Sequence, residues 1–264
     1  MLAIAYYEQK DNVNAKKYAQ MAIDAAKAAG KQPQENALII MGNIEGKSDP
    51  DAARRAIESL ILSNNSPDEW SKIIDDALSH PKTKSIDALF LFRLRNVVGA
   101  MKSDDYVVTA GIASQLHYDK EAASVLESGI NSGKITSAQA TGLAAARRNA
   151  AQDAGVLGSV AAAAEKSRNG QAALALAEDY WGYGRYADVE KMAQLAITKG
   201  GLKDPGEATM LLGMAQVMNG EEAQAQTTLG GVSGAIARTR AAHLWSLLAQ
   251  VKAKNTGSAP APAH

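Results

Sequence analysis

The chain carries Leu2-Ala3-Ile4-Ala5-Tyr6 at its start and Leu176-Ala177-Glu178-Asp179-Tyr180 far downstream. The two stretches share a Leu-Ala pair, and each has a tyrosine four places after its leucine. In both segments a small or β-branched residue lies 13 places, and again 20 places, after that leucine. Self-similarity of this kind marks an internal repeat, and repeats of helical hairpins stack into extended arrays. The pattern therefore predicts an array of helical hairpins.

Three further positions, Thr109, Leu143 and Leu212, show the same offsets. The residues 13 places on are Ala15, Ala122, Val156, Val189 and Ala225, and those 20 places on are Ala22, Gly129, Ala163, Ala196 and Val232. Successive equivalents from Thr109 onward are 34, 33 and 36 residues apart, which is the length of one helix-turn-helix unit. Small residues at fixed offsets are expected where two helices approach closely.

These features resemble the tetratricopeptide repeat family. The resemblance rests on the Leu-Ala or Leu-Gly pairs, on Tyr6 and Tyr180, on the turn glycines Gly184 and Gly220, and on the small residues at the two offsets. It implies an all-α, right-handed α-solenoid of about seven antiparallel helix hairpins. In this family the first helix of each hairpin lines a concave groove that binds proteins or extended peptides.

Helix-breaking and capping residues divide the chain into predicted helix pairs. We expect the pairs at residues 1–30, 34–63, 67–101, 104–132, 135–168, 170–199 and 205–232. The repeats are clearest over 1–30 and 104–232 and degenerate over 34–101. In the degenerate part, the residues 13 and 20 places after Leu38 are Asp51 and Glu58 rather than small residues. A capping helix over 235–253 completes the solenoid, residues 1–253, and we expect a disordered tail at 254–264.

Composition excludes several classes of protein. The chain has 264 residues, of which 46% are hydrophobic and only 5% aromatic, so it can fill a core but does not look like an all-β protein. Its 28 basic and 28 acidic residues give a net charge of zero, and no basic run points to nucleic acid as a partner. No apolar stretch approaches the length of a membrane span.

The chain contains no cysteine, which rules out disulfides and cysteine-ligated metal centres. A cysteine-free chain avoids misoxidation, so we favour the bacterial periplasm over the cytoplasm. The first residues of the sequence do not have the pattern of a signal peptide, yet Leu2 and Ala3 already lie inside a repeat. We therefore expect upstream sequence, which could hold a signal or an anchor, in the natural protein.

Residues that carry chemistry do not gather into a recognisable motif. The histidines, His80, His117, His243 and His264, are scattered and form no metal-ligand pair at helical spacing. No Gly-x-Ser-x-Gly motif is present, and no strand is predicted to support one. We therefore expect a non-enzymatic protein without a metal or a cofactor.

The family resemblance indicates which residues face the concave groove. The tentative binding residues are Tyr7, Arg148, Asn149, Glu178, Trp181, Met214 and Met218. An exposed Trp181 beside Arg148 and Asn149 would suit peptide recognition, because aromatic faces and arginine are common anchors at interfaces. The alternative is that Trp181 packs against a neighbouring helix and Arg148 is solvated. Met210, Met214 and Met218 recur every four residues as a methionine stripe, which either accommodates apolar partners or, as is more common for such a stripe, belongs to the core.

The leading interpretation is a scaffold that binds a protein or peptide in its groove. A second interpretation is a structural segment of a larger anchored or multidomain protein. A third is a small-molecule-binding protein or enzyme with its ligand near Trp181. Arg93 and Arg95, which lie close to Phe90 and Phe92, point to an acidic partner, to phosphate, or to solvated side chains. A homodimer is compatible with every one of these interpretations.

Overall fold

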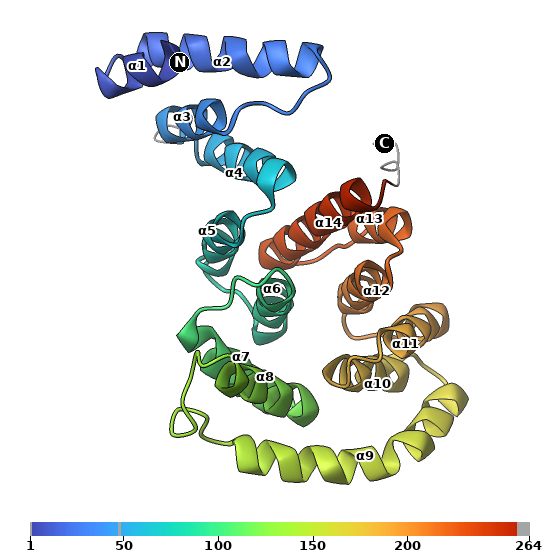
Figure 1. The fold of residues 1–264 in the computed structure, drawn as a ribbon. Coiled ribbons are helices and arrows are strands. Elements are labelled where there is room, and N and C mark those ends of the chain that lie inside the picture. The colour runs from blue at the N-terminus through green and yellow to red at the C-terminus, as the bar shows by residue number, and fades with distance from the viewer. Residues whose placement is uncertain (1, 47–48, 258–264) are drawn as a thin grey trace. The chain divides into compact units, whose positions relative to one another are not determined.

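The computed structural model describes residues 2–46 and 49–257, and this part of the chain contains fourteen helices and no strand (Figure 1). The helices are α1 (Leu2–Glu8), α2 (Asn12–Ala28), α3 (Glu35–Glu45), α4 (Pro50–Asn64), α5 (Pro67–Leu78), α6 (Ser85–Val97), α7 (Ser103–Gln115), α8 (Asp119–Asn131), α9 (Leu143–Lys166), α10 (Gln171–Gly182), α11 (Tyr186–Lys199), α12 (Pro205–Asn219), α13 (Glu222–Gly230) and α14 (Ile236–Thr256). The predicted all-α class is confirmed. None of the described helices has the length and apolarity needed to cross a membrane.

The helix boundaries follow from local chemistry. Asp11 precedes α2 and accepts a hydrogen bond from the backbone N–H of Asn14 at 3.1 Å, which satisfies one of the free donors of the first turn. Asp49 caps α4 in the same way, and Pro50 occupies the first position of that helix. At the other end of α4, Asn65 adopts a left-handed conformation with φ of 50° and stops the helix.

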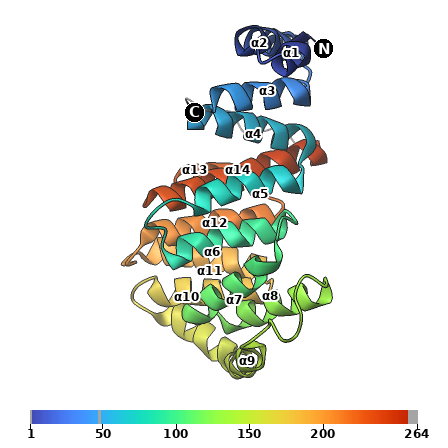
Figure 2. The ribbon, with the colours of Figure 1, turned by 90° about the vertical axis from the view of Figure 1, so that its left-hand side faces the viewer.

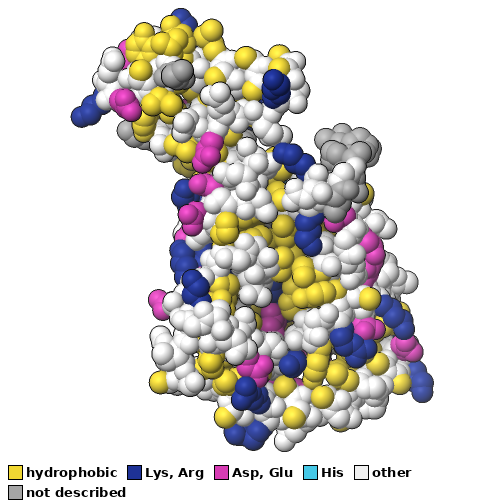
Figure 3. Space-filling model, viewed as in Figure 1, with side chains coloured by type: hydrophobic (Ala, Val, Ile, Leu, Met, Phe, Trp, Pro, Cys, Tyr) yellow, Lys and Arg dark blue, Asp and Glu magenta, His cyan; other side chains and the backbone are white. Residues whose placement is uncertain are grey.

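The chain forms two compact units, residues 1–76 and 77–264, and we describe each by itself. Whether both belong to the single solenoid expected over residues 1–253 stays a prediction. In the first unit, α1 packs on α2 and α3, and α3 packs on α4. Its core is built from buried alanines and aliphatic side chains, with Ala15 and Ala19 fully enclosed. Hydrophobic side chains also gather on the surface of α1 and α2 (Figure 3).

The second unit closes on itself. From α6 to α14 each helix packs against the next, and α8, α10, α12 and α14 also contact one another in succession. The last helix, α14, then packs against α6, so the series returns to its beginning (Figures 1 and 2). The even-numbered helices therefore bury their inward faces against each other.

The predicted hairpin over residues 135–168 is wrong. A loop leads to a single helix, α9, which runs without a break from Leu143 to Lys166. Gly155 and Gly158 lie inside this helix in ordinary helical conformation and form no turn. The reason is the alanine-rich sequence, which favours an uninterrupted helix and contains no proline to break it.

The small-residue pattern fails in the same segment and holds elsewhere. Ala122, Val189 and Ala196 are buried where neighbouring helices meet. Val156, by contrast, is 51% exposed and Ala163 is also exposed on α9. Leu143 therefore does not begin a structural repeat. The capping helix, expected over 235–253, extends from Ile236 to Thr256, and residues 258–264 of the predicted tail lie outside the described residues.

Candidate functional site

Three of the predicted groove residues are not on an open surface. Trp181 is 7% exposed, and Glu178 and Met214 are fully buried. The expectation of an exposed tryptophan is therefore wrong, and the alternative, packing against neighbouring helices, is confirmed. Trp181 meets the ring of Trp245 on α14 edge-on, with the centroids 5.9 Å apart. Residues of α14 thus cover the surface that the repeat pattern assigned to a ligand.

The other predicted groove residues are scattered. Arg148 and Asn149 are exposed on α9, and Met218 is half-buried near the end of α12. Tyr7 is 36% exposed on α1, in the first unit. Met210, one turn from Met214, is fully buried, so the methionine stripe belongs largely to the core. The structure does not bring the predicted set together as one surface of the second unit.

A buried arginine, Arg93, organises the interior of the second unit. Its guanidinium on α6 donates to both carboxylate oxygens of Glu121 on α8, at 2.8 and 2.6 Å. The same group donates to Glu178 on α10 at 2.7 Å and lies 4.9 Å from the ring centre of Trp181. Three helices are therefore joined at one charged group. The acidic partner suggested by the sequence lies within the chain, 28 and 85 residues away from Arg93.

The charges of this cluster do not balance, because one arginine faces two glutamates. Burial raises the pKa of Glu178, and Glu121 adds to that effect, although the ion pair with Arg93 opposes it. Burial alone would lower the pKa of Arg93, but its two carboxylate partners outweigh burial and raise it. Arg93 therefore stays charged, whereas burial shifts Glu178 toward its neutral form.

An open cavity of about 300 Å³ lies beside this cluster, and we call it the α8 groove. Its floor is one face of α8, formed by Lys120, Glu121, Ser124, Val125 and Ser128. The first and last of these residues are eight positions apart on one helical face, so the floor is about 12 Å long at 1.5 Å per residue. The groove has the length of a short extended ligand.

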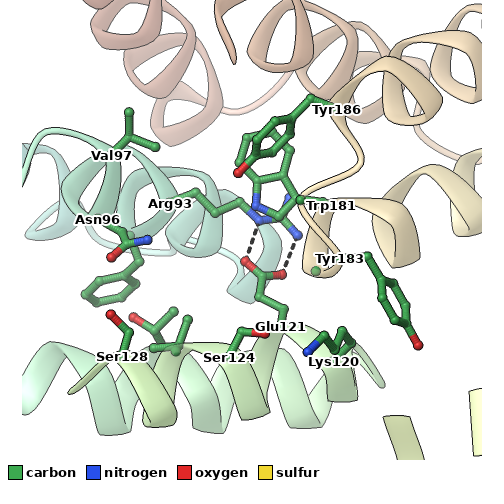
Figure 4. Close-up of a pocket in the computed structure, with 15 residues that line it drawn as sticks. Arg93, Asn96, Val97, Lys120, Glu121, Ser124, Ser128, Trp181, Tyr183 and Tyr186 are labelled. Carbon is green, nitrogen blue, oxygen red and sulfur yellow. Dashed lines mark hydrogen bonds and ion pairs between the residues drawn. The ribbon is translucent and has the colours of Figure 1, made fainter. Parts of the chain in front are cut away.

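Two walls enclose the α8 groove (Figure 4). One wall comes from α6 and contains Asn96 and Val97. The other comes from the end of α10 and the start of α11 and contains Trp181, Tyr183 and Tyr186. Figure 4 shows Lys120 and Tyr183 at one end of the floor and Asn96 and Ser128 toward the other. Hydroxyl and amide groups thus alternate with aromatic and aliphatic surface.

Two residues that line the α8 groove each carry a buried polar atom that has no hydrogen-bond partner in the described part of the chain. These atoms are Nη1 of Arg93 and Oγ1 of Thr109, and both residues are almost fully buried. Buried polar groups in folded proteins nearly always have a partner, either in the protein, in ordered water or in a ligand. A ligand that offers hydrogen-bond acceptors would satisfy both atoms.

A second, much smaller cavity of about 10 Å³ adjoins the groove, and we call it the acidic slot. It shares Lys120, Glu121, Gly182 and Tyr183 with the groove, and Asp119, Asp153, Glu178 and Asp179 also line it. Burial, with repulsion from Asp153 and Glu178, raises the pKa of Asp179 to about 6. Negative charge is therefore concentrated at one end of the α8 groove.

Sequence reasoning missed most of this site. Trp181, Glu178 and Arg93 were singled out beforehand, and Trp181 was assigned to the wrong environment. The sequence does place a polar stripe on one face of a helix, formed by Lys120, Glu121, Ser124 and Ser128. This spacing does not identify the residues of the two opposing walls. No group of His, Asp or Glu side chains among the described residues is placed to hold a metal ion.

The comparisons with known proteins do not extend these observations: no protein-family model, no curated protein and no solved structure matches this chain.

Proposed function

We propose that this protein is a non-enzymatic helical-repeat scaffold that binds a protein or an extended peptide in the α8 groove. We further propose that its repeats are of the tetratricopeptide kind and form a right-handed solenoid. The pairs α1/α2, α3/α4, α7/α8, α10/α11 and α12/α13 are its repeat units, with α14 as the cap. The burial of Ala15, Ala122, Val189 and Ala225 at equivalent positions supports this assignment.

The observation that carries the functional proposal is the pair of unsatisfied polar atoms in the α8 groove. A peptide presents a carbonyl oxygen at every residue, and these acceptors match Nη1 of Arg93 and the hydroxyl of Thr109. Ser124, Ser128 and Asn96 add polar groups along the same groove. Tyr186 and Val97 supply apolar surface for side chains of the peptide.

The scaffold holds this groove in place before any ligand arrives. Arg93 is fixed by Glu121 and Glu178, so its unused donor atom has a defined position. Preorganised groups lose little conformational entropy on binding, which favours affinity. Glu121 has both carboxylate oxygens engaged by Arg93, so its role here is to hold the arginine rather than to act as a free base.

A peptide selection tests this proposal. Random peptides displayed on phage would be selected on the full chain, and the affinity of each selected peptide would be measured against Ser124→Trp, which fills the groove. The matched control is Ser114→Trp, which places the same side chain at an exposed serine of α7 outside the groove. We expect Ser124→Trp to weaken binding at least tenfold and Ser114→Trp to leave it unchanged. Equal binding to all three proteins would refute the α8 groove as the binding site.

A second candidate is a structural segment that packs against another polypeptide through the first unit. An apolar groove of about 350 Å³ there is lined by Leu2, Ile4, Tyr18 and Ile40 together with smaller residues. Leu2, which lines this groove, is 58% exposed. Ala22→Arg would place a charge in this groove. If the groove mediates assembly, light scattering should show a lower mass for this variant than for the unchanged chain.

A further inference from the structure

The acidic slot has an unusual balance of charge for its size. Five carboxylates line it, and Arg93 accounts for Glu121 and for one oxygen of Glu178. The other three acids are Asp119, Asp153 and Asp179, and the structure shows no ion pair for them in the part of the chain that it describes. Lys120 is the one cation that lines the slot, which leaves an excess of negative charge.

A second observation, independent of the number of acids, points to an occupant of the slot. Oε1 of Glu178 is buried, has no hydrogen-bond partner among the described residues, and belongs to a side chain that lines the slot. Leaving a buried carboxyl oxygen without a hydrogen-bond partner costs free energy. The missing partner is therefore a hydrogen-bond donor, and a cationic donor would also offset the charge.

The size of the slot restricts which cation fits. About 10 Å³ of free volume accommodates one water-sized group, and a primary ammonium has that size. A guanidinium is planar and larger, with five N–H donors in a fixed fork, so it does not fit. The described acids are not placed to ligate a metal ion. The end of a lysine side chain meets all of these conditions, since it offers three donors and one positive charge.

The rim of the slot suits the stem of such a side chain. Tyr183 lines both cavities, and the amine of the chain's own Lys120 already lies 5.8 Å from the centre of its ring. Aromatic rings attract cations through their electron-rich faces, and the methylene groups of a lysine pack on the same surface. A side chain that enters from the α8 groove would pass this ring on its way into the slot.

We infer that the acidic slot binds a primary ammonium group, and that the partner in the α8 groove therefore presents a lysine at this position. The second half of this inference rests on the proposed function, whereas the first half concerns the slot alone. Charge complementarity with Asp153, Glu178 and Asp179 supplies the attraction. A lysine-bearing segment is thereby selected over one with a neutral or acidic residue at the same place.

A small-molecule titration tests the slot without any partner. n-Butylammonium reproduces the lysine side chain, and butan-1-ol is a neutral molecule of similar size. Their binding would be followed through the backbone NMR signals of Gly182 and Tyr183. We expect saturable shifts with n-butylammonium, with a dissociation constant of about millimolar for so small a ligand, and no saturable shift with butan-1-ol.

Matched variants make the titration specific. Asp153→Asn combined with Asp179→Asn removes two charges from the slot without touching the bonds of Arg93, and we expect it to weaken n-butylammonium at least tenfold. Asp104→Asn combined with Asp24→Asn removes two exposed charges elsewhere and should have no effect. The inference is overturned if n-butylammonium gives no saturable shift, if butan-1-ol gives the same shift, or if the slot variant binds n-butylammonium as well as the unchanged chain.

The two proposals fail in distinguishable ways. Binding of n-butylammonium without any groove-dependent peptide would support the slot and reject the peptide-binding function. A second outcome would reject the ammonium site and support peptide binding in the α8 groove. In it, n-butylammonium does not bind, and peptides that depend on the groove keep their affinity when their lysine is replaced by norleucine. Both proposals would be supported if the norleucine peptide bound the unchanged chain more weakly than the lysine peptide did, while the slot variant bound the two peptides equally.

Discussion

Arg238 on α14 donates from its Nε to Oδ1 of Asp87 on α6 at 2.7 Å, although 151 residues separate them, and both side chains are almost fully buried. The indole N–H of Trp245 donates to the carbonyl oxygen of Phe90 at 2.9 Å across the same pair of helices. These bonds attach the last described helix to the first complete helix of the second unit. Through these two bonds the series of helices from α6 to α14 returns to α6.

Removing one partner of this pair should destabilise the protein strongly. Arg238→Ala leaves the fully buried Asp87 without its ion-pair partner, and we expect it to cost about 3–5 kcal/mol of unfolding free energy. Asp87→Ala should cost less, because Arg238 keeps its second carboxylate partner, Asp204. The double variant should cost less than the sum of the two single variants, because the Arg238–Asp87 bond is lost only once. Urea unfolding of the four proteins measures this coupling.

The exposed pair between Arg185 and Asp188 is the control for that cycle. Asp188→Ala removes this pair without disturbing the contact of Arg185 with the ring of Tyr180, and it should lower stability by no more than about 1 kcal/mol because water screens exposed ion pairs. Additive effects of Arg238→Ala and Asp87→Ala would show that the two side chains do not interact in solution.

Enlarging a small residue between helices should distinguish true repeats from chance matches to the pattern. Ala196 is fully buried, so Ala196→Leu should overpack the contact and cost about 1–3 kcal/mol. Ala163 has the same place in the sequence pattern but is exposed on α9, so Ala163→Leu should change stability by less than about 0.5 kcal/mol. Equal melting temperatures for these two variants would contradict the assignment of α9 as a single exposed helix.

Trp181 should act as a core residue. It contacts Trp245, Tyr186 and the guanidinium of Arg93, so Trp181→Ala removes a large buried ring and should cost about 3–5 kcal/mol. Trp181→Phe keeps part of this packing and should cost less. Thermal unfolding monitored by circular dichroism measures both. An unchanged melting temperature for Trp181→Ala would mean that the side chain is exposed to solvent.

Stability should depend on pH through carboxylates whose pKa values are raised. Burial and the nearby charge of Glu178 raise the pKa of Glu207 to about 7, compared with about 4.3 in an unfolded chain. Between these two values the folded state binds more protons than the unfolded state. Stability should therefore fall as pH rises through this range, and the loss should be complete above about pH 7.

Glu207→Gln removes this dependence. Because Glu207 is only partly buried and its charge is partly screened, we expect the variant to gain about 1 kcal/mol over the unchanged chain at pH 8 and almost nothing at pH 5. Glu165→Gln changes an exposed carboxylate on α9 and should give no such difference. Guanidinium chloride unfolding at the two pH values provides the comparison, and an equal gain at both would contradict a pKa near neutrality for Glu207.

The sequence by itself determined the helices. Asp11 and Asp49 cap the helices that follow them, and Asn65 ends a helix, through bonds and backbone conformations that involve only near neighbours. The small positions of four repeats were also predictable, because a helix that packs closely on the next one repeats the same steric demand in every unit. The pattern misled at Val156 and Ala163, since an alanine-rich segment matches any requirement for small residues by composition alone.

Only the tertiary structure decided which surface is open. Trp181 and Glu178 carry the periodicity of a groove face, but α6 and α14 close the second unit and bury both residues. The α8 groove and the acidic slot likewise combine side chains from helices that are far apart in sequence, as the bonds of Arg93 to Glu121 and Glu178 illustrate. The physical reason is range: capping and helix propensity act over a few residues, whereas burial and charge pairing depend on which distant segments meet.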